Sequence, residues 1–237
     1  RMLSWDEKLL SLFDGGIYYN GGCIMMGNQK EYQFVSDEVV RRTIKCVSKY
    51  DRLNVVLQLE DEKHAFRFPL EEKWYKSWGI PVEEALSLSQ IGNLKTAKVL
   101  IFYANLLDSV TPLDDELVAS LRELCFDTAQ FYLTDRGKCG QVIGRNINKL
   151  RSIEKIRKSL ALEKEEIAVF GDDVNDIEML SEYKYSVAMG NADEYVKEIA
   201  NYVTYDNDND GVYHAIYNIL RIFGPIGPNG ENALGEK

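Results

Sequence analysis

A short apolar run that ends in a cluster of acids is the part of this 237-residue chain best suited to chemistry. Residues 167–170 (Ile-Ala-Val-Phe) are continuously apolar, which is typical of a parallel strand buried on both faces. Gly171 ends this run. The polar residues that follow within the next five positions are Asp172, Asp173, Asn175 and Asp176. The pattern predicts that these side chains lie at the carboxyl end of a strand, where open α/β sheets bind ligands.

Two interpretations of the acidic cluster follow from its residue types. Clustered carboxylates suit Mg²⁺, which prefers oxygen ligands together with water and substrate phosphate. The alternative is an acidic turn that caps a helix, with Asp173 as the N-cap and the other acids stabilised by the helix dipole. The local pattern leaves both interpretations open.

Further segments on both sides of the cluster extend the pattern. They are residues 17–22 (Ile-Tyr-Tyr-Asn-Gly-Gly), Asn148-Lys149 at the start of a helical stretch over 150–160, residues 186–192 (Ser-Val-Ala-Met-Gly-Asn-Ala), residues 202–204 (Tyr-Val-Thr) and residues 210–212 (Asp-Gly-Val). With the Gly-Asp-Asp-Val-Asn-Asp loop, these segments resemble the haloacid dehalogenase superfamily, specifically its Cof-type phosphatases. The resemblance covers nearly the whole chain.

The resemblance implies an α/β fold, with a Rossmann-like parallel-sheet core and a large inserted αβ cap. We expect the core at residues 1–25 and 140–222, the cap at 26–139 and a loose surface tail at 223–237. Within the cap, residue spacing predicts helices over 37–49, 71–78, 82–88 and 113–124, and strands over 53–59, 64–68, 97–103 and 128–133.

The same resemblance implies Mg²⁺-dependent hydrolysis of small phosphate monoesters, sugar phosphates above all, through an aspartyl phosphate. In this scheme Asp172 is a direct Mg²⁺ ligand that Asp173 assists, and Asn175 hydrogen-bonds the transferring phosphoryl group. Asp176 orients Lys149 or a metal-bound water. Lys149 neutralises phosphate oxygens in the transition state. The family usually has Gly after this lysine, whereas Leu150 follows here.

The sequence contains no Asp-x-Asp-Gly-Thr motif, in which this family carries its nucleophile. Asp14 precedes Gly15 but lies where the family has a variable loop, so it is a poor nucleophile candidate. Family spacing places the end of motif two near Arg1. An omitted segment, a clipped protein and a truncated gene product would each explain the pattern, and we favour an omitted or clipped segment.

Composition restricts the partners. The net charge is −10, from 28 Lys and Arg against 38 Asp and Glu, and this acidic balance excludes a basic nucleic-acid footprint. No apolar run approaches a membrane span, so we expect a cytoplasmic enzyme whose partner is a small phosphorylated metabolite. The spacing of the four cysteines indicates structural thiols rather than a zinc site; they are Cys23, Cys46, Cys125 and Cys139.

Two other functions stay open. Without the nucleophile motif, the chain could be a catalytically silent fragment or relative that binds phosphorylated metabolites. A phosphotransferase such as a phosphomutase would need a second phosphate site in the cap, and the cap arginines are scattered; they are Arg41, Arg42, Arg52 and Arg67. We expect His64 and His214 to be packing or surface residues, and residues 206–210 to form a surface loop.

Overall fold

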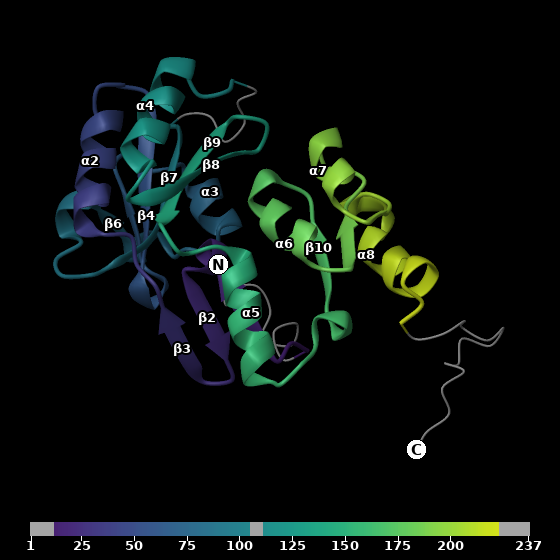
Figure 1. The fold of residues 1–237 in the computed structure, drawn as a ribbon. Helices are drawn as coiled ribbons and strands as arrows, with labels where there is room; N and C mark the ends of the chain where they lie inside the picture. Colours follow the sequence, from purple (N-terminus) through teal and green to yellow (C-terminus); the bar gives the residue numbers. More distant parts are fainter. Residues whose placement is uncertain (1–11, 105–110, 223–237) are drawn as a thin grey trace. The chain divides into compact units, whose positions relative to one another are not determined.

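The computed structural model describes residues 12–104 and 111–222 (Figure 1). The chain divides into two compact units, Arg1–Ser152 and Ile153–Lys237. The predicted tail over 223–237 lies outside the described residues. The expected limits of the core and the cap stay a prediction.

A small antiparallel sheet opens the first unit. Its strands lie in the order β1 (Gly15–Tyr18), β2 (Cys23–Met26) and β3 (Gln29–Tyr32). The 3-10 turn η1 (Tyr19–Gly21) joins the first two strands, and Gly27 turns the chain between the last two with φ 53°. Only the first strand was expected from the sequence, since β3 is short and polar.

A six-stranded sheet forms the rest of the first unit, in the order β6-β5-β4-β7-β9-β8. The strands are β4 (Leu53–Leu59), β5 (His64–Phe66), β6 (Ala85–Ser87), β7 (Thr96–Tyr103), β8 (Ala129–Thr134) and β9 (Cys139–Gly144). All neighbours pair antiparallel except β5 and β6, which pair in parallel. The strands predicted from sequence spacing for this sheet are therefore confirmed.

The helix predicted over 82–88 is wrong. The segment forms a 3-10 turn, η3 (Val82–Glu84), then β6, then a second turn, η4 (Leu88–Gln90). One or two helical turns gain few hydrogen bonds for the residues they fix, whereas Ala85–Ser87 gains a ladder with β5. Pairing in the sheet therefore overrides the local helical spacing.

Two helices cover one face of the large sheet, α2 (Asp37–Val47) and α4 (Asp115–Cys125) (Figure 1). Their apolar sides join a buried core that includes Val39, Leu117 and the strand residues Leu57 and Ile101. Each helix begins at a polar cap. Ser36 Oγ accepts from Val39 N at 3.4 Å, and Asp114 Oδ1 accepts from Glu116 N at 3.0 Å. Such caps satisfy amides that a helix start leaves without partners.

The opposite face of the sheet carries a second, aromatic core. Phe66 and Phe102 pack there with Leu100, and with Tyr75 from helix α3 (Glu72–Ser77). The rings of Phe66 and Tyr75 meet edge to face at 5.2 Å. The backbone amide of Leu70 donates to the Tyr75 hydroxyl at 2.9 Å, so the buried hydroxyl has a partner.

The second unit contains a three-stranded parallel sheet in the order β10-β11-β12. The strands are β10 (Ala168–Gly171), β11 (Tyr185–Ala188) and β12 (Tyr202–Val203). Helices α6 (Ile177–Glu182) and α7 (Glu194–Ile199) make the crossovers that parallel strands require. Helix α8 (Gly211–His214) and the π-helix η8 (Ala215–Ile219) follow. The predicted α/β class is confirmed.

Helix α5 (Lys149–Ser159) begins in the first unit, and its last turns belong to the second. In the second unit Arg157 Nε and Nη2 each donate to the Glu154 carboxylate at 3.0 Å. The hydroxyl of Tyr183 donates to the same carboxylate at 2.7 Å. These bonds hold the pKa of Glu154 down at about 2. They stabilise the charged form of this half-buried carboxyl group. The remaining 3-10 turns are η2 (Glu60–Glu62) and η5 (Lys164–Glu166), with η6 and η7 described below.

Candidate active site

The predicted acidic loop follows strand β10, and a buried carboxylate holds it in shape. Asp176 is 3% exposed. Its Oδ2 accepts from the backbone amides of Asp172, at 3.2 Å, and Asp173, at 3.4 Å. Gly171 leaves room for the Asp176 side chain beside the strand end, because a Cβ at position 171 would lie 2.5 Å from Asp176 Cβ. The sequence therefore uses a glycine and a buried acid to set the path of the loop.

Asp173 caps the turn η6 (Val174–Asp176). Its Oδ1 accepts from Val174 N at 2.7 Å, and its side chain also accepts from the amide of Asp176 in a capping box. Asp173 therefore has the N-cap role that the sequence left open as the alternative to metal binding. Its carboxylate is occupied within the loop, which makes it a weaker metal-ligand candidate than its neighbour Asp172.

Asp172 is the exposed carboxylate of the loop. Asn191 Nδ2 donates to its Oδ2 at 3.1 Å, and Asn191 Oδ1 accepts from Asn207 N at 3.2 Å. Within the described part of the chain, the other oxygen, Oδ1, has no hydrogen-bond partner. An oriented carboxylate with one open oxygen suits a hard divalent cation. Asn191 was not among the predicted site residues, although its amide follows β11 at the same sheet edge.

The rim of this loop is built by close backbone contacts. Gly190 N donates to Tyr205 O at 3.0 Å, and a Cβ at position 190 would lie 2.7 Å from Asp206 N. Asp206 caps the turn η7 (Asn207–Asn209), accepting from Asp208 N at 3.1 Å. This segment is a capped surface turn, as expected. His214 contacts Thr204 Oγ1 at 3.0 Å and stacks on Tyr205 with ring centres 4.1 Å apart, which is a packing role.

A complete metal site is not formed by the residues in the described ranges. No three His, Cys, Asp or Glu side chains converge there. Asp172 offers one oxygen, and Mg²⁺ usually keeps several waters and takes only one or two carboxylates plus substrate phosphate. The donor set fits Mg²⁺ as a partial site in which Asp172 supplies one ligand.

Lys149 lies in the first unit, whereas the other predicted site residues, Asp172, Asp173, Asn175 and Asp176, share one loop of the second. Asn148 Oδ1 accepts from Arg151 N at 2.8 Å and so caps the helix that Lys149 opens. The Asn-Gly turn packs against this helix start. A Cβ at Gly21, which has φ +102°, would lie 2.4 Å from Asn148 O. Ser152 Oγ donates to Gly21 O at 3.2 Å.

Lys98 was missed by the sequence interpretation. It lies on β7, and its ammonium donates to Asn20 Oδ1 at 3.4 Å. Burial, together with the smaller effect of the Lys149 charge and against the opposing effect of Cys139, lowers the pKa of Lys98 to about 8. The available signal was a lysine inside the otherwise apolar run over residues 97–103.

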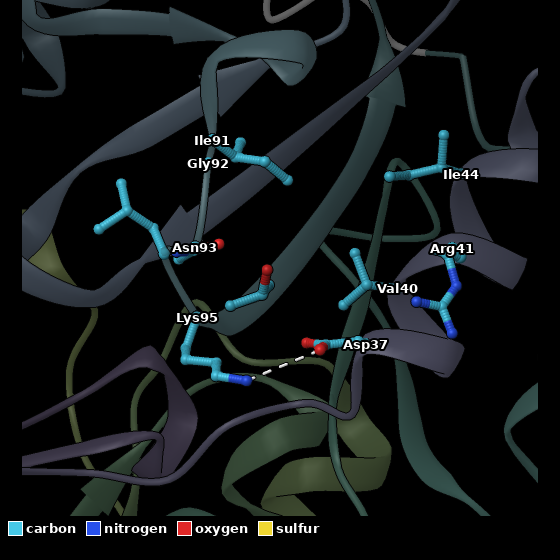
Figure 2. Close-up of a pocket in the computed structure, with 10 residues that line it drawn as sticks. Asp37, Val40, Arg41, Ile44, Ile91, Gly92, Asn93 and Lys95 are labelled. Atoms are coloured by element: carbon cyan, nitrogen blue, oxygen red, sulfur yellow. Dashed lines mark ion pairs between the residues drawn. The ribbon is translucent and has the colours of Figure 1, made fainter.

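A separate pocket of about 430 Å³ lies on the α2 side of the large sheet (Figure 2). Val40 and Ile44 of α2 line it on one side, and residues 91–96 line it on the other. Figure 2 shows Lys95 reaching across it to Asp37, at 3.6 Å. None of the predicted site residues lines this pocket.

No helix within the described ranges is both long enough and apolar enough to cross a membrane. The family model described as haloacid dehalogenase-like hydrolase matches residues 7–216 of the chain. This match covers both units.

Relatives with curated names are similar over shorter segments. A putative phosphatase of Mycoplasma pneumoniae is 34% identical over 82 residues, which are 34% of this chain and 29% of that protein. A 5-amino-6-(5-phospho-D-ribitylamino)uracil phosphatase of Bacillus subtilis is 42% identical over 76 residues, which are 32% of this chain and 30% of that protein. The alignments thus span less than a third of either relative.

A solved structure extends the likeness in fold. A sugar phosphatase of haloacid dehalogenase subclass IIB superposes with a TM-score of 0.70 and 24% sequence identity. The superposition covers 88% of this chain and 76% of that chain. It shows a shared fold.

Proposed function

This chain belongs to the haloacid dehalogenase-like hydrolases, and from that premise we propose that the protein is an Mg²⁺-dependent phosphatase of small phosphate monoesters. The observation that carries the proposal is the loop after β10, in which Asp176 is buried and Asp172 presents an open oxygen. A carboxylate positioned at the carboxyl end of a parallel strand is suited to hold a metal against a phosphate.

Each residue of the loop has a separate task in this proposal. Asp172 would hold Mg²⁺, which when bound would neutralise phosphate charge. Asp176 fixes the loop backbone through its bonds to the amides of Asp172 and Asp173. The half-buried amide of Asn175 hydrogen-bonds an oxygen of the transferring phosphoryl group. Because these groups are already in place, little reorganisation is needed as charge develops.

Lys149 completes the electrostatics in this scheme. Its ammonium balances the charge that accumulates on phosphate oxygens, and it reduces the repulsion between an anionic nucleophile and an anionic substrate. The family resemblance implies an aspartyl-phosphate intermediate, which divides hydrolysis into two steps. The sequence contains no Asp-x-Asp-Gly-Thr motif, in which the family carries the nucleophile for this intermediate.

The substrate class follows from charge and from the relatives. The acidic chain, with net charge −10, disfavours nucleic acid. The named relatives include a phosphatase of a phosphoribityl compound and a sugar phosphatase. We therefore assign sugar phosphates or related cytoplasmic metabolites as the proposed substrates.

Phosphate release from p-nitrophenyl phosphate and a panel of sugar phosphates tests the proposal. We expect turnover with Mg²⁺, loss on addition of EDTA and recovery with excess Mg²⁺. Lys149→Met should lower kcat at least 100-fold, because an electrostatic contact to the transferring group is worth about 2.7–4 kcal/mol in comparable sites. Lys158→Met, an exposed change on the same helix, should leave kcat unchanged. Turnover that survives EDTA would contradict the proposed metal dependence.

A further inference from the structure

The face of the six-stranded sheet that carries the aromatic core also carries a row of polar side chains. Side chains alternate along β7, and Leu100 and Phe102 join the aromatic core, so Lys98 extends from the same face. Gln58 lies opposite Lys98 on β4, and His64 lies opposite Gln58 on β5. The row crosses three neighbouring strands beside an otherwise apolar surface.

Lys98 anchors this row as a buried cation. It is 9% exposed, and within residues 12–104 and 111–222 no carboxylate lies within ion-pair distance of its ammonium. Its ammonium donates to a neutral amide oxygen, that of Asn20. Burying a charge without an opposite charge is costly, and proteins usually pair such groups. Among the described residues, no opposite charge offsets this cost for Lys98.

The surroundings of the Lys98 ammonium include the Asn20 amide, which other side chains hold in place, and the charge of Lys149. Asn20 Nδ2 donates to Gln141 Oε1 at 2.6 Å, and Gln141 Nε2 donates to Thr134 Oγ1 at 2.7 Å, so the amide that receives Lys98 is itself held. The charge of Lys149 also acts on Lys98. Two lysines, one half-buried and one buried, therefore act on the same region of the first unit.

We propose that Lys98, positioned by Asn20 and Gln141, binds an anionic group on the leaving-group side of the substrate. The favoured substrates are phosphate monoesters whose leaving group carries a carboxylate or a second phosphate. This inference rests on the proposed function, since Lys149 takes the transferring phosphoryl group there and Lys98 is left for a second anion. Gln58 lies beside it on β4, and the ring nitrogens of His64 contact Glu62 O and Gln58 Nε2.

Proton uptake follows from this assignment. The groups that act on the Lys98 ammonium are the Cys139 thiol and the Lys149 ammonium, and burial raises the pKa of Cys139, so the thiol stays neutral near pH 8. A bound anion favours charged Lys98, so binding near pH 9 takes up a proton. The preference for anionic leaving groups should fall as the pH rises through about 8.

The test compares 3-phosphoglycerate with glycerol 3-phosphate, which differ by a carboxylate in place of a hydroxymethyl group. In the natural full-length protein we expect kcat/KM to favour 3-phosphoglycerate. Lys98→Met should reduce that preference by about tenfold to hundredfold, the range for a lost hydrogen bond to a charged group. It should change kcat/KM for glycerol 3-phosphate less than twofold. Lys45→Met, on the exposed side of α2, should leave both values unchanged.

The outcomes separate this inference from the proposed function. Equal loss for both substrates would overturn it, because Lys98 would then act on the common phosphoryl group. An unchanged preference in Lys98→Met would overturn it as well. If the wild-type protein hydrolyses neither compound and also fails on p-nitrophenyl phosphate and the sugar phosphates, the phosphatase proposal fails. Calorimetric binding of the same two compounds then decides the inference: selective loss of 3-phosphoglycerate affinity in Lys98→Met supports it, and unchanged affinity overturns it.

Discussion

Replacing Gly171 with alanine should damage the site loop through one contact. The added Cβ would lie 2.5 Å from Asp176 Cβ and 2.8 Å from Asp176 Cγ. Carbon atoms pack at about 3.5–4.0 Å, so the overlap exceeds about 1 Å. The obstructing atoms belong to a buried side chain close to the backbone, so Asp176 or the strand end has to move.

The expected cost has two parts. Overpacking of this kind costs about 1–3 kcal/mol. Displacing the Asp176 carboxylate also weakens its bonds to the amides of Asp172 and Asp173, and hydrogen bonds to a charged group contribute about 1.5–3 kcal/mol. Partial relaxation reduces the sum, so we expect a loss of about 2–4 kcal/mol in the free energy of unfolding.

Urea unfolding and kcat/KM for p-nitrophenyl phosphate measure the two effects in the full-length protein. Gly27→Ala is the control, because a Cβ there meets nothing within 4 Å although φ is +53°. Its cost should be the backbone penalty alone, about 1–2 kcal/mol, with kcat/KM unchanged. If Gly171→Ala costs no more than the control and keeps its kcat/KM, the reasoning about the Asp176 contact is refuted.

Three further predictions concern stability and metal binding. The free energy of unfolding of the wild type, relative to that of Lys98→Met, should rise by about 3 kcal/mol between pH 8 and 10.5, because unfolding takes up a proton at Lys98 in that range. Urea unfolding that shows the same difference in free energy at both pH values would contradict this. Glu154→Gln should cost about 1–2 kcal/mol at pH 7 after allowance for solvent screening. That cost should shrink as the pH falls from 4.5 towards 2, and thermal unfolding that shows no such trend would refute the role given to Arg157. Asn191→Ala should raise the Mg²⁺ concentration for half-maximal activity about tenfold, because it releases Asp172; an unchanged Mg²⁺ titration would exclude that role.

Local sequence signals predicted the elements whose causes are local. Helical spacing over 37–49 and 113–124 predicted helices α2 and α4, and the apolar run before Gly171 identified the strand that ends in the acidic loop. Strand β6 was missed because its stability comes from pairing with β5. Local spacing carries no information on such a partner.

The candidate site residues were chosen from local signals of the same kind. The acidic cluster stands out in the sequence, and the family resemblance implied roles for Asp172 and Asp176, which stay predictions. The difference in burial between them, with Asp176 enclosed and Asp172 exposed, is visible only in the folded chain. Asn191 and Lys98 lie 19 and 78 positions from their hydrogen-bond partners Asp172 and Asn20, so only the folded chain brings each pair together.

The Mg²⁺ dependence of p-nitrophenyl phosphate hydrolysis in Asp172→Asn tests the central claim most directly. Asp51→Asn, an exposed change in the first unit, is the control. We predict that the full-length wild type and the control show saturable activation by Mg²⁺, and that Asp172→Asn loses at least 100-fold in kcat/KM at any Mg²⁺ concentration. Wild-type activity and an unshifted Mg²⁺ titration in Asp172→Asn would contradict the assignment of the acidic loop as the metal site.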